Sequence, residues 1–416
     1  MERQVSREIR DKSVGFTLEQ ACLNIEARTR TSRLPWRGQF SPELIEHLID
    51  RVCPDSRRFL DPFCGSGTVL YEALHKGRVA IGAEVNPAAW HLAALASFVT
   101  LPTIERQFAL AKVRKIASDL GFVGSPGIGS TDCAGQLLQL VKCEAHPFIR
   151  KALAAVVLLG MGDLDELSTE AIARGGFAVN TLLNGLKGLS GTVECHLADA
   201  RVLPLADASV DAVITSPPYI NVFNYHQNYR SAAELLGWSP LEGARSEIGA
   251  NRKHRSNRFL TVIQYSLDMA QSLAELSRVM QPGTPLVIVL GRTSNVLGAA
   301  FENGAMVIDL LERSGSFEIV RRAERCFTNR YGDQIYEDIL IARCIRHEVA
   351  QLEAARNIGI AALLNNIGTV CNKNRAALES AIARAPQVRP SPMLTISVPP
   401  PFIEHSSSTA IAHAGN

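Results

Sequence analysis

The sequence predicts an α/β protein with a mostly parallel sheet, a helical insertion and a disordered C-terminal tail. Short apolar runs rich in β-branched residues alternate with helical patterns over residues 1–100 and 191–345, as in strand–helix–strand units. Only helical patterns occur in residues 101–190, which we interpret as the insertion. A helical extension is expected over 346–385, and proline and serine runs with few apolar residues predict disorder over 386–416.

The first half of the sheet is predicted from two apolar runs that each precede a helix. The strand that ends at Asp61 is followed by a helix over 69–76, which Gly77 ends as a C-cap. Residues 79–84 form the next expected strand, and a helix follows over 88–99. Upstream of both strands, Ser41 and Pro42 predict the start of another helix.

The insertion and the second half of the sheet follow in order. The insertion contains three expected helices, at 104–120, 137–159 and 167–187. The expected elements after it are a strand over 193–197, a strand over 210–214, a helix over 262–280, a strand over 285–290, a helix over 306–313 and closing strands over 317–327 and 335–343. The insertion could be a recognition region, a lid or scaffolding.

Composition restricts the class of protein. The 416 residues are 46% hydrophobic and 20% charged, and the net charge is +2, so any nucleic-acid surface must be a local patch. The nine cysteines include no Cys-x-x-Cys, which predicts neither a metal site nor a disulfide framework and favours a cytoplasmic location. No apolar stretch has the pattern of a signal peptide or reaches the roughly twenty residues of a membrane helix.

A glycine-containing turn follows the first predicted strand. Its glycines allow a ligand to approach the backbone closely, and the helix that begins after it offers free N–H groups. The candidate ligand-binding residues in this turn are Asp61, Pro62, Phe63, Gly65, Ser66, Gly67 and Thr68.

A second motif ends the strand over 210–214. Pro217 and Pro218 stop the sheet because neither can donate a ladder hydrogen bond. Ser216 and the Pro217 carbonyl can accept from an exocyclic amine, and Tyr219 can stack on a planar ring. The alternative is an ordinary Pro-Pro strand end with a packing tyrosine.

Together, these two motifs resemble motif I and motif IV of the amino-methylating DNA methyltransferases. The resemblance implies a Rossmann-like class I methyltransferase sheet, S-adenosyl-L-methionine as cofactor, and transfer of a methyl group to cytosine N4 or adenine N6 of a flipped base. Serine before Pro-Pro-Tyr favours cytosine N4 in that family, with Ser216, Pro217, Pro218 and Tyr219 as the catalytic set. Many cytosine-N4 enzymes carry the catalytic motif first, whereas this chain carries motif I first.

The resemblance also implies further cofactor contacts. Phe40 belongs to a segment that closes over the cofactor in such enzymes, although Trp36 and Phe40 could instead plug the edge of the core. Glu84 ends the second strand, where an acidic side chain can accept from both ribose hydroxyls, and Asn86 follows it. The family usually has aspartate at the position of Glu84. Asp199 would accept from the adenine amine, or else form an Asx turn.

DNA is the expected partner, with a cognate restriction endonuclease as a further candidate. Asn221 and Tyr225 lie in a segment where aromatics interleave with amides, which could line a base pocket or form an amphipathic helix. The densest basic run is either a phosphate clamp or a solvated loop. Its candidate DNA contacts are Arg252, Lys253, Arg255 and Arg258.

Three alternatives compete with the hypothesis of an amino-methylating DNA methyltransferase. An RNA guanine-N2 methyltransferase would share the core but usually has Asp or Asn before Pro-Pro-Tyr. A catalytically silent nucleic-acid-binding relative is disfavoured by the intact glycine turn. A cytosine-C5 mechanism needs a cysteine nucleophile, and Cys64 lies in the glycine turn while no Pro-Cys ends a strand.

Overall fold

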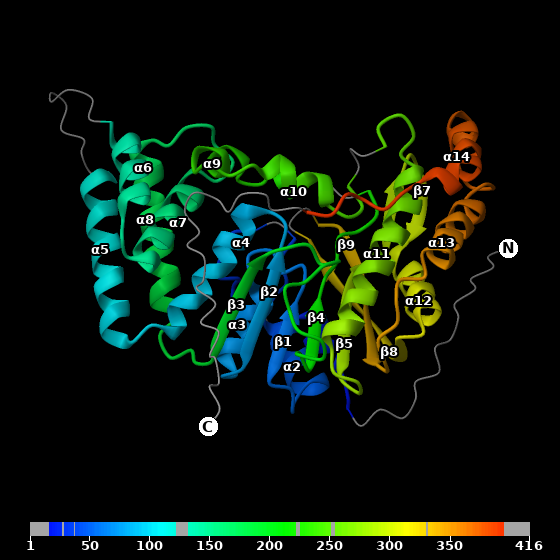
Figure 1. Ribbon diagram of the computed structural model, residues 1–416, viewed down its shortest axis with the longest axis horizontal. Coiled ribbons are helices and arrows are strands. Elements are labelled where there is room, and N and C mark those ends of the chain that lie inside the picture. Colours follow the sequence, from blue (N-terminus) through cyan, green and yellow to red (C-terminus); the bar gives the residue numbers. More distant parts are fainter. Residues whose placement is uncertain are drawn as a thin grey trace, which may run out of the picture. The chain divides into compact units, whose positions relative to one another are not determined.

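The computed structural model describes residues 16–26, 29–36, 38–121, 132–221, 225–250, 254–329 and 332–394. The chain divides into two compact units (Figure 1). The first contains residues 1–100, 186–228 and 240–394, and the second contains 101–185, 229–239 and 395–416. Each unit is described by itself below.

The first unit is built on a seven-stranded sheet. Its strands are β1 (Arg58–Asp61), β2 (Val79–Glu84), β3 (Thr192–Leu197), β4 (Ala212–Thr215), β5 (Pro285–Gly291), β8 (Phe317–Thr328) and β9 (Gln334–Cys344). The order is β3-β2-β1-β4-β5-β9-β8. The pairs β5–β9 and β9–β8 are antiparallel and the other pairs are parallel, so β9 alone runs against the other six strands. The expected α/β class, with its closing hairpin, is confirmed.

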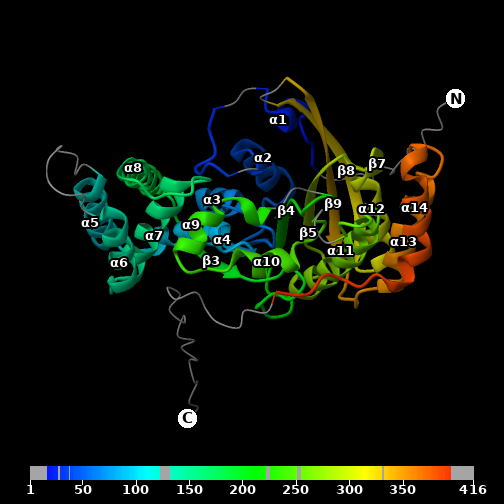
Figure 2. The ribbon, with the colours of Figure 1, turned by 90° about the horizontal axis from the view of Figure 1, so that it is seen from above.

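Helices cover both faces of this sheet. The helices of the first unit are α1 (Gln20–Asn24), α2 (Pro42–Val52), α3 (Thr68–His75), α4 (Pro87–Ala94), α10 (Pro240–Ser246), α11 (Leu260–Val279), α12 (Asn303–Ser314), α13 (Leu352–Asn365) and α14 (Asn372–Arg384). Figure 2 shows α2 and α11 on opposite sides of the sheet. A small hairpin, β6 (Thr293–Val296) with β7 (Ala299–Glu302), was not predicted because each strand has only 4 residues, too few to show a strand pattern.

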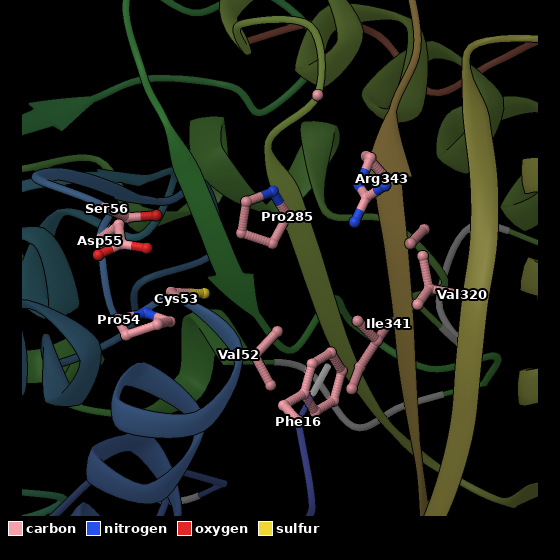
Figure 3. A pocket seen from close by; sticks show the side chains of 12 residues that line it. Phe16, Val52, Cys53, Pro54, Asp55, Ser56, Pro285, Val320, Ile341 and Arg343 are labelled. Atoms are coloured by element: carbon pink, nitrogen blue, oxygen red, sulfur yellow. The ribbon is translucent and has the colours of Figure 1, made fainter. Parts of the chain in front are cut away.

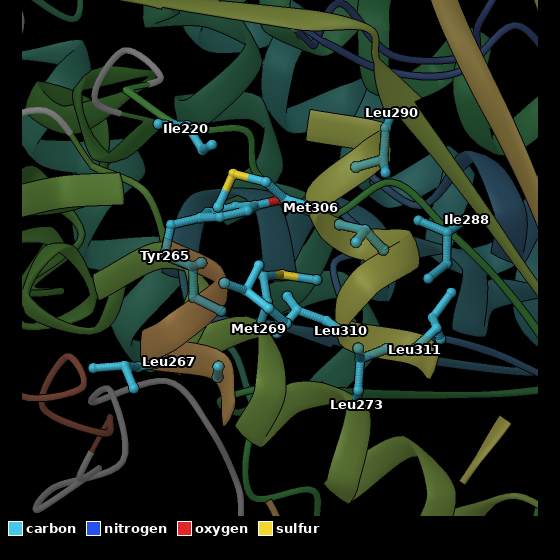
Figure 4. Packing of buried hydrophobic residues seen from close by; sticks show 14 of the residues in the cluster. Ile220, Tyr265, Leu267, Met269, Leu273, Ile288, Leu290, Met306, Leu310 and Leu311 are labelled. Atoms are coloured by element: carbon cyan, nitrogen blue, oxygen red, sulfur yellow. The ribbon is translucent and has the colours of Figure 1, made fainter. Parts of the chain in front are cut away.

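The main core lies between α11, α12 and the centre of the sheet. Leu273 of α11 and Leu310 of α12 are buried against Ile288 and Leu290 of β5 (Figure 4). Tyr265 of α11 is fully buried in the same cluster. Every second residue of β5 packs into this cluster. The close packing on this face holds the strand rigidly and fixes the position of its carboxyl end.

The second unit is helical, as the loss of strand patterns predicts. Its helices are α5 (Thr103–Gly121), α6 (Cys133–Cys143), α7 (Pro147–Met161), α8 (Thr169–Gly185) and α9 (Arg230–Leu235). The single helix expected over 137–159 is wrong. Pro147 begins a new helix, because its ring cannot occupy a helix interior without removing a hydrogen bond. Among the described residues, no helix of either unit has the length and hydropathy to cross a membrane.

The disorder predicted after Pro386 is also wrong for the residues that the structure describes. Val388 and Ser391 are buried, and the chain through Leu394, which we call the strap (residues 388–394), lies against the first unit. Ser391 N donates to Asp268 Oδ1 at 2.7 Å, and the Ser391 and Pro392 carbonyls accept from Arg201. Composition missed this segment because buried polar groups, not apolar burial, hold it in place. Residues 395–416 lie outside the described residues.

Candidate functional site

The two motifs meet at the point where the strand order reverses. Strands β1 and β4 are neighbours, and their carboxyl ends carry the glycine turn and Thr215–Tyr219 respectively. Ligands bind at such switch points in open α/β sheets. The Thr215 hydroxyl donates to Asp61 Oδ1 at 2.6 Å, which ties the two strand ends together. Burial raises the pKa of Asp61 to about 7, although Thr215 and the Phe63 N–H both donate to this carboxyl.

The glycine turn presents its backbone under a cover from the N-terminal segment. Gly65 has φ +52°, and a Cβ there would lie 3.4 Å from Trp36 Nε1. The Ser66 hydroxyl contacts Gln39 Oε1 at 3.4 Å. Trp36, Gln39 and Phe40 line the same cavity as the turn, so the segment before α2 closes over it.

Gly67 is not among the residues that line the cavity, and its expected contact with the cofactor stays a prediction. It has φ +93° and precedes α3 as its N-cap. A Cβ at Gly67 would lie 3.1 Å from the Cβ of Ala93, on the side of α4. Its lack of a side chain therefore serves the turn and the packing of α3 against α4.

Glu84 accepts three backbone hydrogen bonds at the end of β2. Its Oε2 accepts from Gly65 N, and its Oε1 accepts from Val85 N and Asn86 N, each at 2.9 Å. Burial nevertheless raises the pKa of Glu84 to about 7. Because Oε2 receives one bond from the protein, it keeps capacity to accept another from a hydroxyl in the cavity.

Asn86 and Asp199 line the cavity, but their side chains form hydrogen bonds with other groups of the protein. Asn86 Oδ1 caps α4 by accepting from Ala88 N and Ala89 N, and its Nδ2 donates to the Tyr225 carbonyl. The Asp199 carboxylate accepts from Arg201 N, Nε and Nη2 and from Leu394 N. The Asx turn is thus the alternative that the structure favours for Asp199, since four donors leave it no capacity for an adenine amine.

Motif IV forms the opposite wall. Ser216 Oγ lies 3.4 Å from the Tyr219 hydroxyl, and both side chains line the cavity. The Tyr219 ring lies against the end of β5, where a Cβ on Gly291 would be 2.8 Å from Tyr219 Cε2. The absence of a side chain at Gly291 therefore makes room for the Tyr219 ring, a role that sequence reasoning missed. Its only signal in the sequence is a glycine at the end of a buried strand.

The cavity encloses about 780 Å³ at the carboxyl ends of the parallel strands. The predicted site residues that line it are Phe40, Asp61, Pro62, Phe63, Gly65, Ser66, Thr68, Glu84, Asn86, Asp199, Ser216, Pro218, Tyr219 and Tyr225. Gly67 and Pro217, both described, are not part of its lining. Trp36, considered above only as a plug of the core edge, also lines the cavity, as does Gln39 of the same segment. Sequence reasoning missed Glu247, Arg325, Phe327 and Glu337, which line it as well. These residues come from distant segments and belong to no local motif.

A smaller cavity of about 260 Å³ lies at the other end of the strands (Figure 3). It is bordered by Cys53 and Ser56 before β1 and by Pro285 at the start of β5. Neither motif reaches this end, so we assign it no role in the site.

Only part of the expected DNA-binding set is described. Tyr225 lines the cavity, and burial raises its pKa to about 12. Asn221 has φ +59° and donates to the Asn295 carbonyl. Arg255 and Arg258 are exposed, while Arg252 and Lys253 lie outside the described residues.

One group of side chains has the spacing of metal ligands. Ligand atoms of Glu19, Cys22 and His47 lie within 4.8 Å of one another. Glu19 already forms ion pairs with Arg51 at 2.8 Å and with His47 at 3.3 Å, so we assign no metal there.

Comparisons with known proteins agree with the motif that carries the glycine turn. Residues 4–95 match the N6/N4 methyltransferase family model described as "DNA methylase". A type II methyltransferase of Methanocaldococcus jannaschii, M.MjaII, is 30% identical over 83 residues, which are 18% of this chain. The aligned part is 16% of that relative's length, so the chain spans about a sixth of the curated relative it matches.

Matches among solved structures have low identities and low TM-scores. A SAM-dependent methyltransferase from Methanosarcina mazei is 14% identical, with 70% of this chain and 93% of that chain covered and a TM-score of 0.32. An rRNA methyltransferase from Streptomyces viridochromogenes is 14% identical, with 82% and 94% covered and a TM-score of 0.28.

The residues that line this cavity fit S-adenosyl-L-methionine. Because Gly65 has no side chain, space remains between its backbone and Trp36. Glu84 offers an ionisable hydrogen-bond acceptor beside this space. A cavity of about 780 Å³ is within the usual range for cofactors and leaves room beyond the nucleoside. Asp199 does not fit the role of adenine acceptor, for the reason given above.

Proposed function

We propose that the chain is an S-adenosyl-L-methionine-dependent DNA methyltransferase that modifies the exocyclic amine of a flipped base, with cytosine N4 favoured over adenine N6. The observation that supports this most is the junction of the two motifs in one cavity, joined by the Thr215–Asp61 hydrogen bond. The match of residues 4–95 to the DNA methylase family supports the same reaction class.

In this proposal, Gly65 and Glu84 hold the cofactor and Ser216 holds the amine. Bound S-adenosyl-L-methionine would supply an electrophilic methyl group. The Ser216 hydroxyl, which lines the cavity, would accept from the amine, and this hydrogen bond localises a lone pair otherwise conjugated into the ring. Tyr219 would stack on the base, which is worth roughly 1–3 kcal/mol. Catalysis would then come from orientation and electrostatics without a covalent enzyme intermediate.

DNA as substrate and a cognate restriction endonuclease as partner belong to the proposal. The match of residues 4–95 to the family described as DNA methylase supports DNA as substrate. Arg255 and Arg258, which are exposed, would contribute contacts to phosphates together with Arg252 and Lys253.

The test is methyl transfer from labelled S-adenosyl-L-methionine to unmodified DNA or to tRNA, followed by digestion and mass spectrometry of the nucleosides. We expect N4-methylcytosine in DNA, and Ser216→Ala should lower turnover while the cofactor affinity stays unchanged. N6-methyladenine alone would change the substrate, and N2-methylguanine in tRNA would replace the proposal with RNA modification. Cofactor binding without transfer to either nucleic acid would leave a silent relative.

A further inference from the structure

Three residues on adjacent strands continue the wall that Tyr219 begins. Gly291 of β5 is opposite Glu337 of β9, and Glu337 is opposite Arg325 of β8. Residues opposite each other in a sheet project from the same face. The Tyr219 ring fills the place of the missing Gly291 side chain, so Tyr219, Glu337 and Arg325 follow one another across this face of the sheet.

Arg325 is buried in the wall of the cavity with an unused donor. Its Nε lies 2.8 Å from Glu337 Oε2, and its guanidinium lies 4.6 Å from the centre of the Phe327 ring. Arg325 is 6% exposed, and its Nη1 has no hydrogen-bond partner among the described residues. A buried guanidinium N–H without an acceptor is costly, so this donor points to an acceptor on a ligand.

The position of Arg325 relative to Tyr219 suggests which acceptor it meets. Strands are about 4.8 Å apart, so Arg325 lies about two strand spacings from the ring on which a base would stack. A base whose amine is held at Ser216 turns its remaining ring edge away from motif IV. Cytosine offers two adjacent acceptors there, N3 and O2, which suit the planar fork of an arginine. Adenine offers N1 alone.

We propose that Arg325 donates to the N3–O2 edge of the target base and selects cytosine, with Glu337 holding the guanidinium plane. This inference rests on the proposed function and assigns the specificity of that same site. Glu337 is a positioning residue, since it acts through Arg325. The main competing role for Arg325 is contact with a DNA phosphate, which would be indifferent to the base.

The experiment combines a protein change with a base change. Wild type, Arg325→Met and the control Arg322→Met, which removes a half-buried arginine of the same strand that pairs with Asp338, are given DNA synthesised with cytosine or with 2-thiocytosine. N4-methylation is measured as kcat/KM, and cofactor affinity is measured by calorimetry without DNA. We expect Arg325→Met to lose about 10- to 100-fold in kcat/KM with unchanged cofactor affinity, and Arg322→Met to behave as wild type.

The combination separates base recognition from other roles. Sulfur at position 2 is a poor acceptor, so 2-thiocytosine should slow the wild type but have little further effect on Arg325→Met. Equal slowing of both proteins would overturn the proposal, because a phosphate contact or a folding role would be independent of the base atom. Methylation of adenine alone would overturn the role of Arg325 in selecting cytosine, although the proposed methyl transfer to DNA would still be correct. A wild type that binds the cofactor but methylates no DNA would defeat the proposed function, and this inference with it.

Discussion

Replacing Glu84 by glutamine tests the cofactor end of the cavity. The carboxylate accepts from Gly65 N, Val85 N and Asn86 N, so a side-chain NH2 in either orientation must oppose at least one backbone N–H. One buried donor then loses its partner, which costs about 1–3 kcal/mol of folding free energy. The loss of the charged acceptor should weaken S-adenosyl-L-methionine by about 10- to 100-fold, since a hydrogen bond to a charged group contributes about 1.5–3 kcal/mol.

The pH dependence makes this prediction specific. The pKa of Glu84 is raised by burial to about 7, and a hydroxyl prefers to donate to the ionised form. Cofactor affinity of the wild type should therefore rise as the pH goes from 6 to 8. Asp61 titrates in the same range, so Glu84→Gln should reduce the rise without abolishing it. Calorimetry at each pH measures both effects.

The free energy of unfolding should fall as the pH rises, whereas the cofactor affinity should increase. The pKa of Glu84 in the folded protein lies above its ordinary value of 4.5, so the folded state binds the proton more tightly than the unfolded state. Its contribution is fully present below pH 4.5 and is lost as the pH rises to about 7, at about 1.4 kcal/mol per unit at most. The free energy of unfolding of Glu84→Gln should lack this loss.

Exposed Glu194 at strand β3 provides the control, because Glu194→Gln should leave affinity and both pH profiles unchanged. Parallel pH profiles of affinity for wild type and Glu84→Gln would refute the assignment of Glu84 to the cofactor site.

Three further outcomes are expected. Gly291→Ala places a Cβ 2.8 Å from the Tyr219 ring and should lower methylation at least tenfold in a folded protein that still binds cofactor; unchanged kcat would mean that the ring position is unimportant. Arg201→Met removes the cation between the buried carboxylates of Asp199 and Asp268 and should cost about 3–5 kcal/mol in chemical denaturation. A loss below about 1 kcal/mol would show that Arg201 does not hold the strap in place. Neutralising Arg255 and Arg258 should reduce the slope of log K for DNA binding against log salt concentration by about two units. An identical slope would mean that neither arginine contacts a phosphate.

The sequence by itself determined the sheet, the insertion and the two motifs. Strand-forming runs, the glycine turn and the Pro-Pro strand end are local patterns, and local patterns depend on a few neighbouring residues. The carboxyl ends of neighbouring parallel strands must meet at one edge, so Asp61 and Ser216 could be placed together before any coordinates.

Tertiary structure decided which side chains remain available to a ligand. Asp199 has the right place in the sequence, but Arg201 and Leu394 saturate its carboxylate. Gly67 belongs to the glycine turn but is not among the residues that line the cavity, and a Cβ there would lie against Ala93. Arg325 lies about a hundred residues beyond Tyr219 and reaches it only through the register of β5, β9 and β8. Hydrogen-bond saturation and strand register both depend on residues distant in the chain, so no local pattern carries them.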